Sequence, residues 1–401
     1  MKLSKKKPEL LSPVQDFVSL TAAIQAGADA IYFGIKGLNM RAGARNFLIK
    51  DLKKIIEQCH KNKVKAYLAL NTIIYDKELK NVQSLLKKAK EAKVDAIIAW
   101  DFSIINEANK LNLPIHISTQ ASLANFEAIK TLKKQYKNIQ RVILARELDL
   151  TQISSIISQL KKAKINIEIE TFIHGAMCVS VSGRCFLSQE VFGKSANRGE
   201  CLQPCRRLYT IKDVEEGHEF ELGPDYVLSP KDLCTITIID KLLTSGISCF
   251  KIEGRNRSPE YVKVVTEVYR EAIDNKKADK KKLFKKLKTV YNRGFSKGFY
   301  LGKPIDEWSK DYGSQASKKK IYVGVVKNFY KKHSVAEIKV ETHGIKIGDH
   351  LMIQGNKTGV IEQKVNSMQI NHKEVKQIKK GKIGIKLEKS SRENDKVFVI
   401  K

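Results

Sequence analysis

Eight short apolar runs, each followed by a stretch with helical spacing, constrain the fold of this 401-residue chain more than any other feature. The helical stretches include DLKKIIEQCHKN and LTQISSIISQLKKAK, which place apolar residues on one face. The runs between them are ELLSP, AIYFG, KAYLAL, AIIAWD, PIHIST, RVILA, IEIETFIHG and CFKIEGR. Strict alternation implies parallel strands joined by crossover helices, and eight such units predict an α/β fold, a closed (β/α)8 TIM-like barrel.

Polar and charged residues lie within or directly after most of these runs. The active site of such a barrel lies at the C-terminal ends of its strands, so these residues are candidates for substrate binding and catalysis. Any single one could instead cap a strand end or hold a loop, so the prediction rests on their gathering at one rim. The catalytic candidates are Arg41, Asn71, Gln120, Arg146, Glu170, His174, Lys251, Glu253 and Arg255, with Asn46, Asp101, Ser118, Thr119 and Glu147 as further rim residues.

The pattern also predicts the domain organisation. The barrel is expected over residues 1–300, with a cysteine-rich insertion at 175–234 after the seventh strand, an acidic hairpin-like stretch inside it, and a helix beginning near Lys231. Long insertions in compact folds are usually functional. After a linker at 301–317, short alternating runs separated by glycine turns predict an all-β module of five or six strands over 318–401, closed as a small barrel. That module has no cysteine, so we expect it to position a partner.

Five of the seven cysteines fall in or beside the insertion, and their spacing leaves several chemistries open. Cys59 and Cys249 sit in apolar periodic segments, where a cysteine behaves as a small buried hydrophobe. The others are Cys178, Cys185, Cys201, Cys205 and Cys234. Zinc fits the close pair at 201 and 205 but not the pair at 178 and 185, whereas an iron–sulfur cluster tolerates wider spacing and gains from the glycine and serine neighbours. A catalytic thiol or incidental cysteines are the other interpretations.

The net charge of +31 has two interpretations, a polyanionic partner or solvated surface lysines. A polyanionic partner such as nucleic acid would be attracted by a field of this sign, but lysine-rich solvated helix faces would give the same count. There is no apolar run long enough to span a bilayer and no cleavage-site pattern after the basic N-terminus. We therefore expect a cytoplasmic protein without membrane attachment, in which disulfides are disfavoured.

The cysteine segment ETFIHGAMCVSVSGRCFLS resembles the signature of peptidase family U32, and GECLQPCR, LSPKDLC and FKIEGR resemble its later blocks. The likeness extends over the chain, from ELLSP and ADAIYFG to STQAS, NRGFSKGF and the terminal β module. It implies a cytosolic barrel protein whose better-understood members are oxygen-independent hydroxylases carrying a [4Fe–4S] cluster. Those members modify tRNA, ribosomal RNA or a quinone precursor.

The subgroup with SPKDLC, KIEGR and the C-terminal module implies a tRNA hydroxylase that forms 5-hydroxyuridine at the wobble position, with prephenate or a similar carboxylate as hydroxyl donor. Carried over, the cluster ligands would be Cys178, Cys185, Cys201 and Cys234, with Cys205 as an alternate. The alternatives are a collagenase-like peptidase, a hydroxylase of ribosomal RNA or another substrate, and a noncatalytic RNA-binding protein with a structural metal.

A dicarboxylate donor would need cationic partners. Arg41, Arg146, Lys251 and Arg255 carry positive charge at different strand ends, and the arginine fork suits a carboxylate. The competing interpretation is that Arg146 and Arg255 form structural ion pairs with Glu147 and Glu253.

Overall fold

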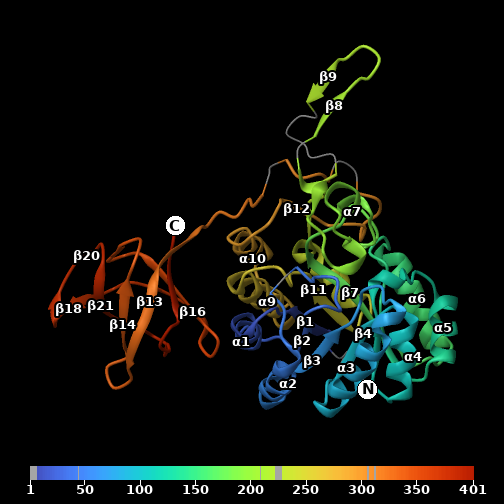
Figure 1. The fold of residues 1–401 in the computed structure, drawn as a ribbon, viewed down its shortest axis with the longest axis horizontal. Helices are drawn as coiled ribbons and strands as arrows, with labels where there is room; N and C mark the ends of the chain where they lie inside the picture. Colours follow the sequence, from blue (N-terminus) through green and yellow to red (C-terminus); the bar gives the residue numbers. More distant parts are fainter. Residues whose placement is uncertain (1–6, 44, 208, 222–227, 305–306, 311–312) are drawn as a thin grey trace.

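The computed structural model describes residues 7–43, 45–207, 209–221, 228–304, 307–310 and 313–401. Its larger part is a parallel barrel (Figure 1), which confirms the predicted fold class. The barrel strands are β1 (Glu9–Pro13), β2 (Ala30–Gly34), β3 (Lys65–Ala69), β4 (Ala96–Ala99), β5 (Ile115–Ile117), β6 (Ile139–Ile143), β7 (Glu168–Gly175) and β11 (Cys249–Ile252). Each pairs in parallel with the next, and β11 closes the ring because Phe250 pairs with both Leu10 of β1 and Thr171 of β7.

Helices with one buried face surround the strands. In α2, Leu52, Ile55, Ile56 and Cys59 are buried while the lysines face solvent, so Cys59 is core, as its apolar context predicts. The helices are α1 (Phe17–Gln25), α2 (Leu52–Lys61), α3 (Leu79–Glu91), α4 (Phe102–Lys110), α5 (Phe126–Gln135), α6 (Leu150–Lys162), α8 (Ile239–Thr244), α9 (Pro259–Asp274) and α10 (Lys280–Leu287). Short 3₁₀ turns occur at Ile49–Asp51, Asp76–Glu78, Thr119–Ala121, Ala196–Arg198, Pro204–Arg206 and Ile236–Ile238.

The insertion leaves the barrel after β7 and covers the C-terminal ends of the strands. It contains α7 (Leu187–Phe192) and the hairpin β8 (Thr210–Lys212) and β9 (Glu219–Glu221), which projects from the body in Figure 1. The helix predicted near Lys231 is wrong. Residues Asp232–Cys234 form β10, because their backbone pairs antiparallel with the end of β7, and β12 (Phe295–Ser296) adds beyond it. Helix α8 begins only at Ile239.

The C-terminal part is an antiparallel all-β module, as predicted, with more strands than the five or six counted in the sequence. Its main sheet contains β13 (Lys320–Tyr330), β14 (Val335–Val340), β16 (His350–Gly355), β17 (Gly359–Lys364), β18 (Met368–Ile370), β19 (Lys373–Glu374), β21 (Gly381–Lys386) and β22 (Lys396–Ile400), beside the ribbon of β15 (Ile345–Lys346) and β20 (Gln377–Ile378). The sheet curls until β17 meets the end of β21, where the Gln363 amide donates to the Lys386 carbonyl at 2.8 Å and accepts from the Glu388 amide at 2.9 Å.

The module docks beside the barrel on helices α1 and α9. Ala22 packs with Met352 and Val360 of the module in a small apolar cluster. The Thr21 hydroxyl donates to the Asn356 carbonyl at 2.6 Å, and Lys320 pairs with Glu260 at 2.9 Å. Among the described residues, no helix combines the length and apolar character needed to cross a lipid bilayer.

Candidate functional site

A layer of charged side chains fills the barrel interior below the site. Glu170 of β7 is fully buried, and it accepts from Lys251 at 2.7 Å and from Arg141 of β6 at 3.2 Å. Arg141 also bonds Glu9 at 2.8 Å. Burial together with the charges of Arg141 and Lys251 lowers the pKa of His116 well below its usual value, so this imidazole is neutral. Glu170 and Lys251, predicted as catalytic, thus have structural partners in each other.

Replacing Lys251 by methionine is expected to lower the free energy of unfolding by about 3 kcal/mol, because removing one member of a buried ion pair strands the other charge. The control is Lys65→Met, which breaks a pair between Glu9 and a lysine side chain that is 55% exposed. Such a surface pair contributes less than about 1 kcal/mol. Denaturant titration compares the two variants. Equal destabilisation would contradict the structural role of the Glu170–Lys251 pair.

Above this layer, three arginines surround one carboxylate. Arg41 donates to Glu253 at 2.9 Å, and the guanidinium groups of Arg255 and Arg146 lie close enough to act on the same carboxylate. Burial raises the pKa of Glu253, but the three guanidinium charges outweigh it and bring that pKa to about 2. Glu253 is therefore a fixed negative charge, which makes it an anchor for arginines and a poor proton donor.

The guanidinium groups of Arg146 and Arg255 have fewer hydrogen-bond partners than that of Arg41. Arg146 donates from Nη1 to the Ala176 carbonyl at 3.0 Å, while its buried Nε and Nη2 have no hydrogen-bond partner among the described residues. Arg255 donates from Nη1 to Asn39 at 3.0 Å, and its buried Nε is similarly unpartnered. Burial lowers the pKa of Arg146, and brings that of Arg255 to about 10. The predicted ion pairing thus occurs at Arg41 rather than at Arg146 or Arg255.

The two predicted amides connect the barrel rim to the insertion. Asn71 donates to Gln120 at 3.3 Å, and Gln120 donates to the Ser182 carbonyl of the insertion at 3.1 Å. On the opposite side, Gly199 packs so closely that an added Cβ would lie 2.2 Å from the Asn39 carbonyl oxygen, and its φ is +83°. Only glycine fits such a contact at this backbone angle. The insertion is therefore fixed over the mouth.

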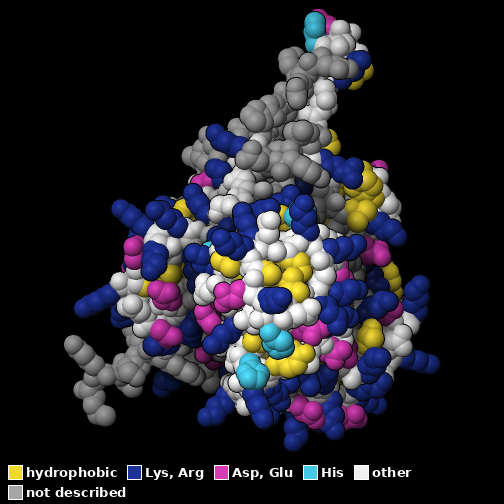
Figure 2. Space-filling view, turned by 90° about the vertical axis from the view of Figure 1, so that its left-hand side faces the viewer, with side chains coloured by type: hydrophobic (Ala, Val, Ile, Leu, Met, Phe, Trp, Pro, Cys, Tyr) yellow, Lys and Arg dark blue, Asp and Glu magenta, His cyan; other side chains and the backbone are white. Residues whose placement is uncertain are grey.

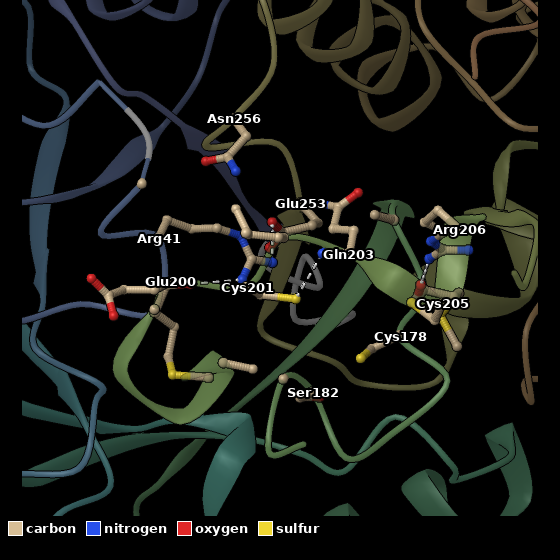
Figure 3. Close-up of a pocket in the computed structure, with 18 of the residues that line it drawn as sticks. Arg41, Cys178, Ser182, Glu200, Cys201, Gln203, Cys205, Arg206, Glu253 and Asn256 are labelled. Atoms are coloured by element: carbon tan, nitrogen blue, oxygen red, sulfur yellow. Dashed lines mark hydrogen bonds and ion pairs between the residues drawn. The ribbon is translucent and has the colours of Figure 1, made fainter. Parts of the chain in front are cut away.

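A cavity of about 410 Å³ lies between the insertion and the strand ends. Figure 3 shows Cys178, Cys201 and Cys205 around the same opening as Arg41 and Glu253. Its other walls include Gln120, Arg146, Phe172, Arg206, Asn256 and Arg293. A second, smaller cavity of about 40 Å³ shares Arg41 and Glu253 with the first and is also lined by Asn71, Lys251 and Arg255. Seven predicted catalytic residues thus line these two cavities, which share Arg41, Gln120 and Glu253 in their walls, whereas Glu170 and His174 line neither.

The thiols of the cavity wall differ in their acidity. The Cys178 thiol lies 3.2 Å from the Ser180 hydroxyl. Burial raises its pKa, but hydrogen bonds from Ser180 and Gly183 and the charge of Arg41 outweigh this and lower the pKa below its usual value. Burial raises the pKa values of Cys201 and Cys205. Cys178 is therefore the thiol of this wall that most readily becomes a thiolate.

Cys234 and His174 lie beneath the insertion, in the core. Cys234 is 3% exposed, its sulfur is 3.9 Å from the Tyr269 hydroxyl, and burial raises its pKa to about 12. The same hydroxyl is 3.3 Å from His174 Nδ1, and burial lowers the pKa of this histidine to about 4. Cys185 accepts from the Leu187 amide at 3.4 Å within the insertion. Within the described ranges, no three Cys, His, Asp or Glu side chains converge as a metal site.

Several cavity residues were missing from the sequence prediction, among them Arg206, Arg293 and Asn256. Arg206 follows Cys205 directly and donates to Ser229 at 2.8 Å, while Arg293 is held by Asp232 at 3.1 Å. Asn256 follows the predicted Arg255, so extending the last strand end by one residue would have included it. Arg293 comes from a segment beyond the barrel strands, and its sequence gives no signal for this position.

The family of the chain follows from comparison with known sequences. The sequence model of a family described as peptidase family U32 matches residues 15–310, three quarters of the chain. This chain belongs to peptidase family U32. The U32 chain is 46% identical over 404 residues to an uncharacterized protease of Methanocaldococcus jannaschii, with 98% of each chain covered. It is 42% identical over 404 residues to a collagenase of Porphyromonas gingivalis, with 97% of each covered.

A third relative carries a different name. The U32 chain is 35% identical over 337 residues to tRNA hydroxylation protein P1 of Bacillus subtilis, which covers 81% of this chain and 78% of the relative. Membership in U32 therefore joins this chain both to proteins named as proteases and to proteins named for RNA hydroxylation. The chemistry of the cavity has to decide between them.

Proposed function

We propose that this U32 chain is an iron–sulfur-dependent, oxygen-independent RNA hydroxylase that forms 5-hydroxyuridine at the tRNA wobble position, with prephenate or a similar carboxylate as hydroxyl donor. One observation carries the proposal. Three thiols and the unsatisfied guanidinium of Arg146 line the same cavity at the barrel mouth. Soft thiolate ligands favour an iron–sulfur cluster over hard cations, and a buried guanidinium favours a carboxylate.

The cysteines fit a cluster by donor type, and two of them compete for the place of the fourth ligand. Cys178, Cys201 and Cys205 line the cavity, and Cys185 lies in the same insertion. Cys234, the fourth ligand in the set implied by the family resemblance, points into the core beside Tyr269. We propose Cys178, Cys185 and Cys201 as ligands, with either Cys205 or Cys234 as the fourth. When bound, the cluster would supply one-electron chemistry at the mouth.

The arginines would bind and orient the donor. Nε and Nη2 of Arg146 and Nε of Arg255 have no hydrogen-bond partner in the part of the chain that the structure describes, so they can bind the donor. Arg41 forms an ion pair with Glu253. Its role would be to keep the Glu253 carboxylate away from the negatively charged donor. Burial of these groups excludes water from the charge pairs, which strengthens an ion pair with an entering carboxylate. The chain thus supplies binding and orientation in a space closed by the insertion.

A second groove supports an RNA substrate. It has a volume of about 1020 Å³, lies between the barrel and the β module, and shares Gly43 and Asn256 with the site cavity. Its basic residues are Arg45, Lys320, Lys357, Arg392 and Lys396, against the acidic Asp16, Glu393 and Asp395. Phosphate contacts of this kind provide affinity without reading sequence. A polynucleotide could therefore run along the groove to the cavity.

The test is the reaction itself. Anaerobically purified protein with intact iron and sulfide is expected to add one oxygen atom to a uridine of unmodified tRNA when prephenate is present, as detected by mass spectrometry of nucleosides. The controls omit the donor or replace the tRNA by ribosomal RNA. Product on ribosomal RNA alone would redirect the proposal to that substrate, and no product with either RNA would contradict it.

Peptidase activity is the second candidate, favoured by the lowered pKa of Cys178 and by the names of two relatives. A cysteine nucleophile needs a base within hydrogen-bonding reach. The predicted partner His174 instead bonds Tyr269 and packs against Tyr261 and Phe295 in the core. Gelatin hydrolysis that disappears in Cys178→Ala but persists after iron removal would favour the peptidase.

A further inference from the structure

Three arginines that neighbour cavity-wall residues in the sequence each lie over an aromatic ring. The Arg184 guanidinium lies 5.1 Å from the ring centre of Trp100, Arg198 lies 4.6 Å from Tyr75, and Arg207 lies 4.5 Å from Phe192. In each pair the arginine belongs to the insertion. Trp100 and Tyr75 come from the barrel loops after β4 and β3, so these two pairs also join the insertion to the barrel.

Each of these arginines is adjacent in sequence to a residue of the cavity wall. Gly183, Gly199 and Arg206 line the cavity, and Arg184, Arg198 and Arg207 are their direct neighbours. Consecutive Cα atoms are about 3.8 Å apart, so the backbone of each arginine lies next to the cavity wall. We call Tyr75, Trp100, Arg184 and Phe186 the stacking rim. Phe186 is included because it follows Arg184 by two residues in the sequence.

Two aromatic side chains of the stacking rim are exposed to solvent, although burying them would stabilise the fold. Phe186 is 77% exposed and Tyr75 is 50% exposed. Arg184 donates to the Gln120 carbonyl at 3.1 Å and has no carboxylate partner among the described residues. Arg198, in contrast, is paired with Glu78, so the Tyr75 side is held in place. Exposed aromatic rings near a guanidinium that has no carboxylate partner among the described residues are suited to flat, electron-rich, negatively charged ligands.

We propose that the stacking rim binds unpaired nucleotides on either side of the nucleotide whose base enters the cavity; this inference rests on the proposed RNA substrate. Aromatic side chains stack on bases of any sequence, and each such contact contributes roughly 1–3 kcal/mol. A duplex hides its base faces, and an enzyme acting on a base must take it out of the stack. The stacking rim therefore selects single-stranded segments such as loops, while the basic groove holds the backbone.

Tryptophan fluorescence tests this directly, because the chain has only two tryptophans, Trp100 and Trp308. In a Trp308→Phe background, Trp100 is the sole reporter. A single-stranded oligoribonucleotide is expected to quench its emission, whereas the same sequence in a duplex, inorganic polyphosphate and an acidic peptide are expected to leave it unchanged.

Affinity gives the second readout. Phe186→Ala is expected to weaken binding of the single strand roughly 5- to 150-fold, the equivalent of one lost stack, while Phe186→Tyr keeps it. The matched control is Tyr330→Ala, which removes a 46% exposed aromatic on the β module and should change nothing. Equal affinity for duplex and single strand, quenching by polyphosphate or the acidic peptide, or an unchanged affinity in Phe186→Ala would each overturn the inference. These measurements need no turnover: rim-dependent binding without hydroxylation would contradict only the proposed function, and hydroxylation without rim dependence would contradict only this inference.

Discussion

Cys178→Ser protein, purified without oxygen, is expected to have lost most of its iron and sulfide and to form no hydroxylated nucleoside. The reason is that a cluster needs three or four thiolates, and Cys178 is the cavity thiol whose pKa is lowered. Iron and sulfide assays together with the visible absorption spectrum measure the loss. The same result is expected for Cys185→Ser and Cys201→Ser.

The comparison of Cys205→Ser with Cys234→Ser then assigns the fourth ligand. Cys205 lines the cavity with two other thiols, whereas Cys234 would have to leave its place beside Tyr269. The variant that keeps its iron identifies the cysteine that is not a ligand. Cys59→Ala and Cys249→Ala are the controls, because both cysteines are buried in the barrel away from the cavity. Full iron in Cys178→Ser, or zinc in place of iron in the native protein, would contradict the cluster.

Arg146→Met is expected to lower the efficiency with which the donor is used by roughly 30-fold or more, since truncating one side of a buried charged contact costs about 2–5 kcal/mol. The effect should appear as a higher KM for prephenate at unchanged cluster content. Arg146→Lys should recover part of the loss, because lysine keeps the charge but not the planar fork.

The control for this prediction is Arg293→Lys. Arg293 lines the same cavity but directs Nε and Nη2 to Asp232 at 3.2 and 3.1 Å, so these nitrogens are not free for a ligand. A donor KM that rises equally in both variants would indicate a general disturbance of the cavity. Wild-type donor kinetics in Arg146→Met would show that its unsatisfied nitrogens do not bind the donor.

The fold was largely predictable because its signal is local. A run such as AIYFG is apolar at every position, and a strand buried on both faces needs that pattern. The rim was predictable for the same reason, since a residue directly after a run must lie at the strand end. The prediction at Asp232–Cys234 was wrong because a strand of three residues is too short to show a periodic pattern. Its conformation depends on pairing with β7.

The chemistry of individual rim residues depends on distant partners, which one sequence does not reveal. Nothing near Arg41 indicates that Glu253, 212 residues away, engages it and leaves Arg146 unsatisfied. Arg141 was overlooked because it lies inside the run RVILA, where a charge looks like an outward-facing strand residue. It instead reaches Glu170 and Glu9 across the barrel interior.

The position of the β module also bears on how the protein is assembled during translation. The barrel closes where β1 meets β11, a pairing between residues 240 positions apart, and α1 and α9 cover that seam. The module contacts both helices: Thr21 of α1 bonds Asn356, and Lys263 of α9 lies 3.8 Å from Glu362 of β17. The module therefore holds α1 and α9 together on the outside of the β1–β11 pairing.

Within the module, β22 pairs with both β13 and β16, so the sheet is incomplete until residues 396–400 have been synthesised. The barrel strands emerge from the ribosome long before the module can fold and contact α1 and α9. During that interval the seam is held only by its own pairing and by the α1–α9 contact, and whenever this pairing opens, the strand edges are exposed to other chains. Truncated or stalled products of this protein should therefore aggregate through the barrel seam, although every barrel strand is already present in them.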